Sequence, residues 1–188
     1  MGFESRAEAE RFLKEFRERL AKFGLELHAE KTRLIEFGKF AEQNRRRCGE
    51  GKPETFTFLG FTHYCGKRRS DGSFIVWRKT ASKRMVAKLR ALKAELIRRK
   101  HDPSAHVGEW LRKVVQGYYQ YHAVPGNLNQ LSAFRHRLCR LWRAILNRRS
   151  QRGDRPWQRL NLLLERWIPF PRVLHPYPQA RFAASHPR

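Results

Sequence analysis

The feature that most constrains the fold is a series of three amphipathic segments between residues 82 and 149. In each segment apolar side chains recur at steps of three and four, which is the spacing of one face of an α-helix. The segments are Ser82–Lys100, Ala105–His122 and Asn127–Arg149. Only short breaks containing Pro103 and Pro125 separate them, and short connections favour antiparallel neighbours. The sequence therefore predicts a three-helix bundle.

The apolar positions of these segments give the predicted core. They are Met85, Leu89, Leu92 and Leu96 in the first helix, Val107, Trp110, Leu111, Val114, Tyr118 and Tyr121 in the second, and Leu131, Phe134, Leu138, Leu141, Trp142 and Ile145 in the third. Gly117 lies beside the second stripe, where a glycine costs about 1 kcal/mol relative to alanine unless a neighbour approaches closely. We therefore expect another helix to cross at Gly117, and we expect Asn127 to cap the third helix.

The chain after residue 149 is predicted to hold one more helix and a tail. Gln151–Asp154 is a polar break, and apolar residues share one side of a shorter helix over Pro156–Trp167. Residues 168–188 contain five prolines in 21 positions, which excludes a regular helix. We expect an extended tail that lies along the helices or is disordered at its end.

The chain before the bundle has a mixed pattern. Ser5 and Glu8 form a capping-box pattern, which opens an amphipathic helix that Gly24 closes. Thr32–Phe37 predicts a short strand, and residues 39–54, with two glycines, a proline and three consecutive arginines, predict a loop. We expect a fold of the α+β class, in which a helix, a short strand and a β-hairpin precede a mostly helical bundle.

The β-hairpin is predicted over Thr55–Val76. Two runs of β-branched and aromatic residues are joined at Ser70-Asp71-Gly72, where Asp and Gly tolerate the left-handed backbone of a tight turn. The first run centres on Phe58-Leu59-Gly60-Phe61. Gly60 inside a strand indicates a bulge or the close approach of another backbone. Three parts are therefore expected, residues 1–78, 79–167 and 168–188.

Charge is distributed unevenly along the chain. The net charge is +24 and the pI about 11.2, a balance that suits nucleic acid or an anionic membrane as partner. Residues 1–72 carry 16 Lys/Arg against 12 Asp/Glu, whereas residues 73–188 carry 25 against 5. Arginine outnumbers lysine by 29 to 12, which suits RNA, although codon bias in a GC-rich genome gives the same excess. We expect the partner surface in the second part.

Several cations of this second part are candidates for phosphate contacts. Those on the outward face of the first bundle helix have Ala87 and Ala94 between them, small residues that let a phosphate backbone come close, and others lie on the outward face of the third helix. A further group follows the third helix. The candidates are Lys83, Arg90, Arg98, Arg140, Arg143, Arg148, Arg149 and Arg152. The alternative is that they are solvated, or neutralised by Glu95 and Glu109.

Catalytic and metal-binding patterns are sparse in the sequence. The five acidic residues of positions 73–188 are placed singly, and residues 1–72 hold no DxD pair, so no two-metal site is expected. The histidines show neither HxxxH nor HExxH spacing. Cys48, His63 and Cys65 lack a fourth ligand, so we expect reduced thiols there and at Cys139, and no metal site. No apolar run approaches the roughly 18 residues of a membrane span and no signal peptide is recognised, so the cytoplasm is the expected compartment.

An ordered series of motifs resembles a known family, the group II intron reverse transcriptases. Leu27-His28-Ala29-Glu30-Lys31-Thr32 and Phe58-Leu59-Gly60-Phe61 resemble the last two motifs of the family's palm domain. The later motifs resemble its maturase-specific thumb domain. They are Trp110-Leu111, Gly117-Tyr118-Tyr119, Val124-Pro125-Gly126-Asn127, Trp142, and His175-Pro176-Tyr177-Pro178 with Arg181-Phe182. The resemblance covers nearly the whole chain.

The resemblance implies a role for each part. Residues 1–78 are similar to the end of a palm, residues 79–167 to the thumb, and residues 168–188 to a proline-rich tail. Lys31 falls on a palm lysine near the phosphates of the incoming nucleotide, and Phe58, Leu59, Gly60 and Phe61 fall on the hairpin that supports the primer's 3′ end. The thumb helices hold the template–primer duplex and the intron RNA in the family. The alternative for Lys31 is an exposed loop lysine without a ligand. The alternative for Phe58 to Phe61 is a strand of the core.

The family's catalytic aspartates precede the helix that begins near Ser5, and they do not occur in this sequence. We therefore expect an RNA-binding C-terminal part of a reverse transcriptase/maturase that assists intron splicing and template–primer binding and is inactive alone. Mg²⁺ is expected only in a complete polymerase, with an N-terminal polymerase part as a further partner. The rival hypotheses are a free-standing basic RNA-binding or RNA-chaperone protein without polymerase ancestry, and a nuclease, which needs a metal cluster.

Overall fold

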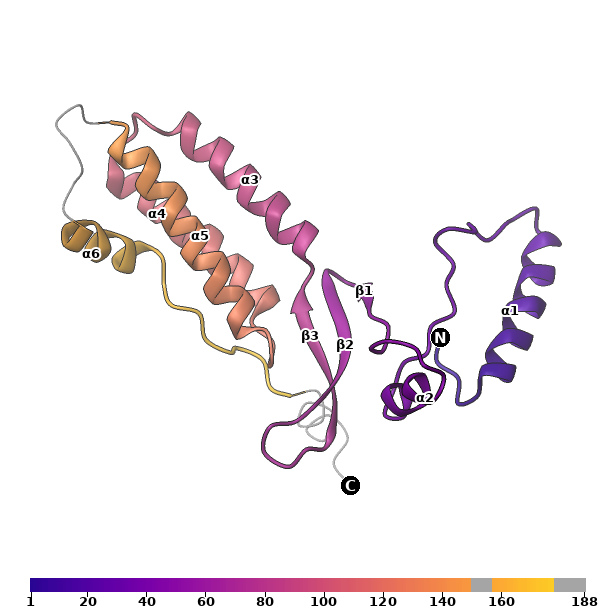
Figure 1. Cartoon of the computed structure of the whole chain (residues 1–188). Helices are drawn as coiled ribbons and strands as arrows, with labels where there is room; N and C mark the ends of the chain where they lie inside the picture. The colour runs from indigo at the N-terminus through magenta and orange to yellow at the C-terminus, as the bar shows by residue number, and fades with distance from the viewer. Residues whose placement is uncertain (150–156, 178–188) are drawn as a thin grey trace, which may run out of the picture. The chain divides into compact units, whose positions relative to one another are not determined.

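The computed structural model describes residues 1–149 and 157–177, and within them the fold is of the α+β class (Figure 1). Six helices accompany a three-stranded antiparallel sheet with the strand order β1-β2-β3. The elements are α1 (Arg6–Ala21), α2 (Ala41–Arg47), β1 (Phe56–Phe58), β2 (Phe61–Lys67), β3 (Phe74–Thr80), α3 (Ser82–Arg98), α4 (Ser104–His122), α5 (Leu128–Asn147) and α6 (Trp157–Trp167). The expected fold class is confirmed.

Two compact units divide the chain. Residues 1–56 and 64–76 form the first unit, and residues 57–63 with the chain from Trp77 onward form the second. The β1–β2 tip, which we define as Phe58, Leu59, Gly60 and Phe61, therefore belongs to the same unit as the helical bundle. The three parts expected from the sequence, with boundaries after residues 78 and 167, stay a prediction.

In the first unit α1 begins as the sequence predicts. The Ser5 side chain accepts a hydrogen bond from the Glu8 backbone N–H at 3.2 Å, and Gly24, with a φ of 67°, follows the end of the helix. The Phe12 ring lies 5.1 Å from Phe3 and 5.6 Å from Phe16 between centroids. Only Ala9 of the apolar stripe is buried, so the stripe is partly covered at most.

Two predictions for the first unit are wrong. Thr32–Phe37 forms no strand, because a segment with strand-like composition becomes a strand only where a neighbouring strand hydrogen-bonds to it. The Phe37 ring instead packs against the Phe56 ring, with 4.9 Å between the centroids. The predicted loop over residues 39–54 contains α2. The glycines and proline of that stretch lie outside Ala41–Arg47, and a hydrogen bond of 2.7 Å from Asn44 Nδ2 to Glu36 Oε1 ties α2 to the preceding segment.

The predicted first strand of the hairpin is two strands. β1 and β2 are joined by a two-residue turn in which Leu59 and Gly60 have φ of 47° and 81°, and positive φ at both central positions is the type I′ pattern. Gly60 is therefore a turn residue, and its placement inside a strand was wrong. The turn between β2 and β3 is confirmed, since Asp71 accepts hydrogen bonds from the N–H and hydroxyl of Ser73 at 3.1 and 2.8 Å.

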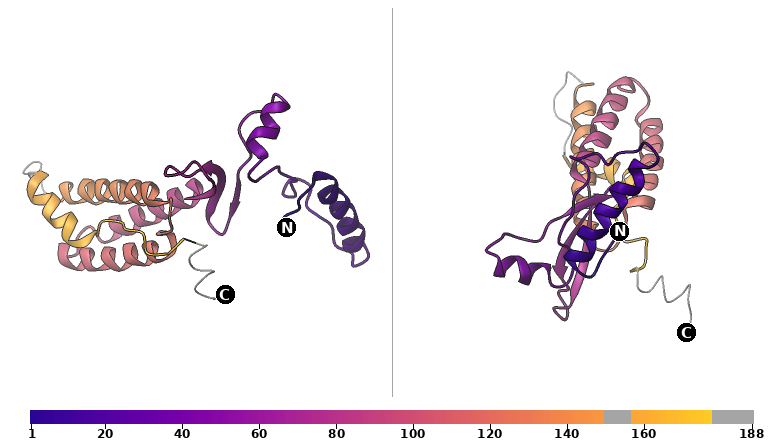
Figure 2. Two further views of the ribbon diagram at one scale, coloured as in Figure 1. Left: turned by 90° about the horizontal axis from the view of Figure 1, so that it is seen from below. Right: turned by 90° about the vertical axis from the view of Figure 1, so that its right-hand side faces the viewer.

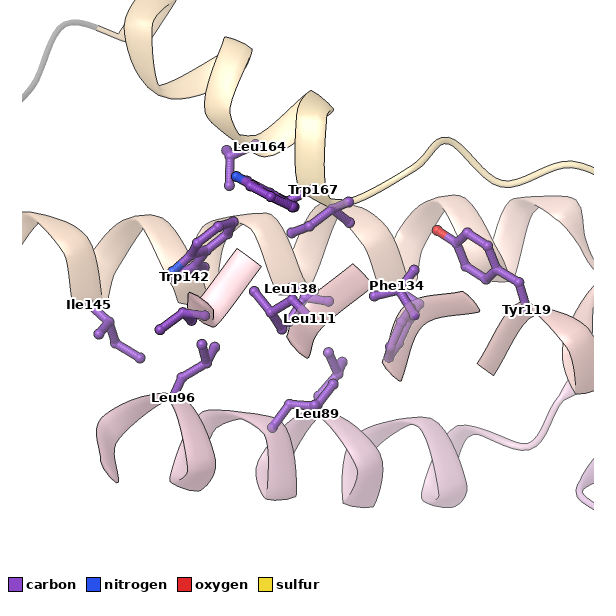
Figure 3. Packing of buried hydrophobic residues seen from close by; sticks show 14 of the residues in the cluster. Leu89, Leu96, Leu111, Tyr119, Phe134, Leu138, Trp142, Ile145, Leu164 and Trp167 are labelled. Atoms are coloured by element: carbon purple, nitrogen blue, oxygen red, sulfur yellow. The ribbon is translucent and has the colours of Figure 1, made fainter. Parts of the chain in front are cut away.

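The second unit is built on the predicted bundle. α3 and α5 point in the same direction and pack together, while α4 runs back (Figures 1 and 2). Figure 3 shows the core, with Leu89 and Leu96 of α3 on one side and Leu164 and Trp167 of α6 on the other. The predicted core stripes of α3 and α5 are buried apart from Leu141, which is half-buried. In α4 Val107 and Leu111 are buried as predicted. In the second half of the helix the buried stripe is shifted by one residue, so that Val115 and Tyr119 are buried and Tyr121 is half-exposed.

The glycine at the helix crossing is Gly108, and the prediction for Gly117 is wrong. A Cβ on Gly108 would lie 2.5 Å from Cγ of Trp167, so α6 packs on α4 where no side chain intervenes. A Cβ on Gly117 would meet no atom within 4 Å. Gly108 and Gly117 are nine residues apart and so lie on opposite faces of α4, Gly108 on the buried face and Gly117 on the exposed one.

A buried polar network joins β3 to the turn between α4 and α5. Asn127 is the N-cap residue of α5, as predicted, but its side chain makes no cap bond within the helix. Its Oδ1 accepts from the Thr80 N–H, and its Nδ2 donates to Thr80 Oγ1 and to the His122 carbonyl oxygen, each at 2.8 Å. Beside this network, a Cβ on Gly126 would collide with the ring of Trp77, which packs directly on the glycine. The end of the hairpin is thus fixed to the bundle.

The described part of the tail, residues 168–177, lies along the helices. The Tyr119 hydroxyl donates to the Pro169 carbonyl oxygen at 3.2 Å, and the Leu174 N–H donates to the Ala123 carbonyl oxygen at 2.9 Å. Arg135 donates to the Ile168 carbonyl oxygen at 3.1 Å and lies 3.7 Å from the ring centroid of Phe170. One of the two expected tail arrangements is therefore confirmed for these residues. Of the helices in the described ranges, none has the length and apolar character needed to cross a membrane.

Candidate nucleic-acid interface

The cations of the second unit gather on α3 and α5. α5 contains four arginines and no acidic residue, and the single acid of α3, Glu95, accepts from Arg98 at 3.1 Å and from Arg99 at 2.7 Å. The basic residues of the two helices are Lys83, Arg84, Lys88, Arg90, Lys93 and Arg98 on α3 and Arg135, Arg137, Arg140 and Arg143 on α5. α3 and α5 pack side by side, and we call the exposed cations on the outward sides of these two helices the α3–α5 face.

Three of the predicted phosphate contacts are open to solvent on this face. Lys83, Arg90 and Arg140 are exposed, and within the described chain none of them forms an ion pair. Arg98 pairs with Glu95, but its side chain is 80% exposed, and an exposed pair of this kind is weak enough for a phosphate to compete. Arg143 is half-buried and already engaged in an interaction.

The predicted group after the third helix is divided in the structure. Arg148 is exposed at the end of α5. Arg149 is half-buried, and its guanidinium donates to the carbonyl oxygens of Arg99 at 3.0 Å and Asp102 at 2.9 Å, which caps the end of α3. This geometry suits a structural role for Arg149. Arg152 lies outside the described residues.

α4 and α6 present a different surface. The outward side of α4 carries Glu109, Gln116 and Gln120 beside Arg112 and Lys113, and all five side chains are exposed. Glu165 is exposed on α6. Since acids and neutral amides are mixed with the cations here, a polyanion gains less from this side than from the α3–α5 face. The charge of the bundle is therefore polarised.

The β1–β2 tip adds apolar groups to the second unit. Phe58 is 60% exposed and Leu59 is 65% exposed, whereas Gly60 and Phe61 are buried. Phe61 packs its ring 5.6 Å from Tyr121 and 5.2 Å from His122, which fixes the base of the tip on α4. The four residues that the resemblance assigns to primer support thus divide into two that anchor the hairpin and two that face solvent.

Lys31 belongs to the first unit. It is exposed in a turn in which its N–H donates to the His28 carbonyl oxygen at 3.1 Å, a position compatible with a phosphate contact or with a solvated loop lysine.

Burial shifts the pKa values of four ionisable groups of the bundle in favour of their uncharged forms. It raises the pKa of Tyr118 to about 12 and also raises the pKa values of Tyr119 and Cys139. It lowers the pKa of His122 to about 4, with a smaller contribution from the Arg84 guanidinium. These phenols and the thiol therefore supply no negative charge to offset the cations of the α3–α5 face.

Metal ligands are not grouped in the part of the chain that the structure describes, where no three His, Cys, Asp or Glu side chains converge. Cys48, Cys65 and Cys139 are free thiols.

Several residues of the basic surface were not among the predicted contacts. Arg84, Lys88 and Arg137 are exposed on α3 and α5 beside the predicted contacts. The sequence alone could have predicted Arg137, because residues 128–147 contain no acidic residue and every cation of that helix is therefore a candidate phosphate contact. Tyr121, whose ring packs on Phe61 of the tip, was predicted as a core residue of the second helix and is half-exposed.

No protein-family model matches the chain, and neither a curated protein nor a solved structure matches it. The functional assignment therefore depends on the residues themselves.

Proposed function

We propose that this chain binds RNA through the α3–α5 face, as the C-terminal part of a group II intron reverse transcriptase/maturase that acts in the cytoplasm. Its RNA ligands are the intron RNA and a template–primer duplex, and it assists intron splicing. Lys31 and the β1–β2 tip would serve a polymerase whose catalytic aspartates and Mg²⁺ lie outside this sequence.

The observation that carries the proposal is the polarised charge of the bundle. The outward sides of α3 and α5 carry exposed cations, and the one acid on these two helices is occupied by Arg98 and Arg99. Phosphates neutralise such a surface and release condensed counterions, which supplies most of the affinity of a protein for nucleic acid. Arginines predominate on α5, and their guanidinium groups bind phosphate in bidentate fashion and stack on exposed bases, as RNA-binding surfaces require.

The exposed apolar tip favours the reverse-transcriptase hypothesis over a simple RNA chaperone. Electrostatic binding of RNA requires neither a rigid hairpin on the bundle nor exposed side chains such as Phe58 and Leu59 at its end. A site for a duplex end requires both.

A splicing assay with purified chain tests the proposal. Group II intron RNAs are incubated at Mg²⁺ concentrations too low for self-splicing, with a self-splicing RNA of another structural class as the control. We expect the chain to restore splicing of one or more group II introns and to leave the control RNA unchanged. Equal stimulation of both RNAs would point to the chaperone alternative, and failure to bind any of these RNAs would contradict the proposal.

A further inference from the structure

The tail that follows α6 carries an exposed aromatic ring at a fixed position. Phe170 is 65% exposed, although it belongs to a segment that packs along the bundle. It lies between Pro169 and Pro171. Proline fixes its own φ angle and also restricts the residue before it, so Pro171 limits the backbone of Phe170. The backbone at Phe170 is therefore restricted before any ligand binds.

Hydrogen bonds fasten the chain on both sides of Phe170. Before it, the carbonyl oxygens of residues 168 and 169 accept hydrogen bonds from Arg135 at 3.1 Å and from the Tyr119 hydroxyl at 3.2 Å. After it, His175 Nε2 donates to a backbone carbonyl oxygen of α4 at 2.6 Å. Phe170 therefore lies on a short span of chain that α4 and α5 hold at both ends.

The guanidinium of Arg135 covers one face of the Phe170 ring. Its Cζ lies 3.7 Å from the ring centroid, which is the separation of a stacked cation–π pair. Arg135 is half-buried, and its bond to the tail holds the guanidinium in this position. Because Phe170 is still 65% exposed, the opposite face of the ring is the surface left for a ligand.

The charges near this ring favour RNA as the ligand. Residues 168–177 and α5 contain no acidic residue, and Arg172 is exposed two positions after Phe170. Aromatic side chains stack on unpaired bases in RNA-binding proteins, while neighbouring cations hold the phosphates. A paired base lies between its neighbours in the duplex stack and offers no free face to a side chain. The ring therefore suits a single strand, a loop or a bulge.

We propose that Phe170 is a stacking site for one unpaired base of the bound RNA and that Arg135 is a positioning residue that holds the ring. The proposal rests on the proposed function, because it takes RNA as the ligand. The stacking residue belongs neither to the α3–α5 face nor to the β1–β2 tip. Stacking uses the flat face that every base has, so the site does not select one base.

The test compares two RNA hairpins with the full chain. One hairpin has a loop of adenosines, and the other has the same stem and a loop of abasic residues, so the two carry equal numbers of phosphates. Stacking of one base on an aromatic side chain contributes about fivefold or more to affinity. We expect the wild-type chain to bind the adenosine loop more tightly than the abasic loop by at least this factor.

Phe170→Leu keeps an apolar side chain and removes the aromatic face. We expect it to lower the preference for the adenosine loop by about fivefold or more, and to keep the affinity for the abasic hairpin within about twofold, because phosphate contacts supply that affinity. Phe170→Trp should retain the preference. The thermal midpoints of both variants should agree with that of the wild type, since the side chain is exposed.

Phe40→Leu is the matched control. Phe40 is 62% exposed, and the Lys39 ammonium lies 5.6 Å from its ring centroid, so this ring also has a cation beside it. Phe40 lies in the first unit, and its replacement should leave the preference at the wild-type value. An equal loss of preference in Phe40→Leu and Phe170→Leu would overturn the assignment of the site to Phe170.

Arg135→Lys tests the positioning role. It keeps the charge but removes the flat guanidinium that covers the ring and bonds to the tail. We expect a lower preference for the adenosine loop and an affinity for the abasic hairpin within about twofold of the wild type. A preference equal to that of the wild type would contradict the positioning role of Arg135.

The proposal and the proposed function fail in different ways. If the wild-type chain binds both hairpins equally, or if Phe170→Leu keeps the full preference, the stacking site is excluded while RNA binding stands. The ring would then fasten the tail or contact a protein. A wild-type chain that binds neither hairpin would overturn both proposals.

Discussion

At the scale of the residue, the two glycines of α4 make a matched pair. Gly108→Ala should destabilise the fold by about 1 to 3 kcal/mol, because its Cβ would lie 2.5 Å from the buried Trp167 ring. Gly117→Ala should stabilise it by up to about 1 kcal/mol, because its Cβ has open space and alanine favours a helix. Urea denaturation of both variants measures the difference. Equal effects of the two changes would show that α6 does not pack on α4 at Gly108.

His122 should make folding stability depend on pH. Its pKa is about 4 in the folded protein and its ordinary value is 6.5, so the unfolded chain binds the proton more strongly between these values. Stability is therefore complete above about pH 6.5 and falls as the pH falls towards 4, by up to about 3 kcal/mol. Urea denaturation at pH 7, 5.5 and 4.5 should show a smaller loss for His122→Gln than for the wild type. His136→Gln, an exposed control on α5, should behave as wild type, and the same loss in all three proteins would refute the assignment.

The residue scale also shows what the sequence can and cannot predict. Periodicity identified Leu89, Phe134 and Leu138 as core residues, because one face of a helix is set by the sequence of that helix. It did not identify Tyr121 as a partner of Leu59, because that bond joins residues 62 positions apart and depends on tertiary packing.

At the scale of the element, the joint between β3 and the α4–α5 turn depends on Asn127. Asn127→Ala removes the side-chain oxygen that accepts from the buried Thr80 N–H, and it should cost about 2 to 3 kcal/mol. Asn129→Ala, exposed in the first turn of α5, is the control and should change stability by less than about 0.5 kcal/mol. Thermal denaturation of both variants tests this joint, and similar midpoints would mean that the network contributes little.

Long helices were predictable and short elements were not. α3, α4 and α5 begin and end within two residues of their predicted bounds, because many apolar positions agree on one period. Thr32–Phe37 has the composition of a strand but has no strand beside it, and α2 is too short for a period to be recognised. The Leu59-Gly60 turn was missed because Leu is disfavoured in such turns.

At the scale of the whole molecule, a fragment that begins at Thr57, which holds the second unit together with residues 64–76, should fold on its own. A fragment that begins at Arg78 lacks Phe61, which packs on Tyr121 and His122, and also lacks Trp77, which packs on Gly126. It should be less stable than the Thr57 fragment by about 3 to 5 kcal/mol, the usual cost of losing a buried aromatic side chain. Urea denaturation of the two fragments measures this difference. Equal stability would show that the tip does not belong to the bundle.

The most direct test of the account is the salt dependence of RNA affinity in two double variants with the same loss of charge. Arg90→Gln with Arg140→Gln changes the α3–α5 face, and Arg112→Gln with Lys113→Gln changes the outward side of α4. Each phosphate contact contributes about 0.7 to 0.9 log units of affinity per tenfold change in salt. We expect the first variant to bind RNA more weakly, with a slope reduced by about one to two contacts, and the second to keep the wild-type slope. Equal slopes in the two variants would contradict the claim that RNA binds the α3–α5 face.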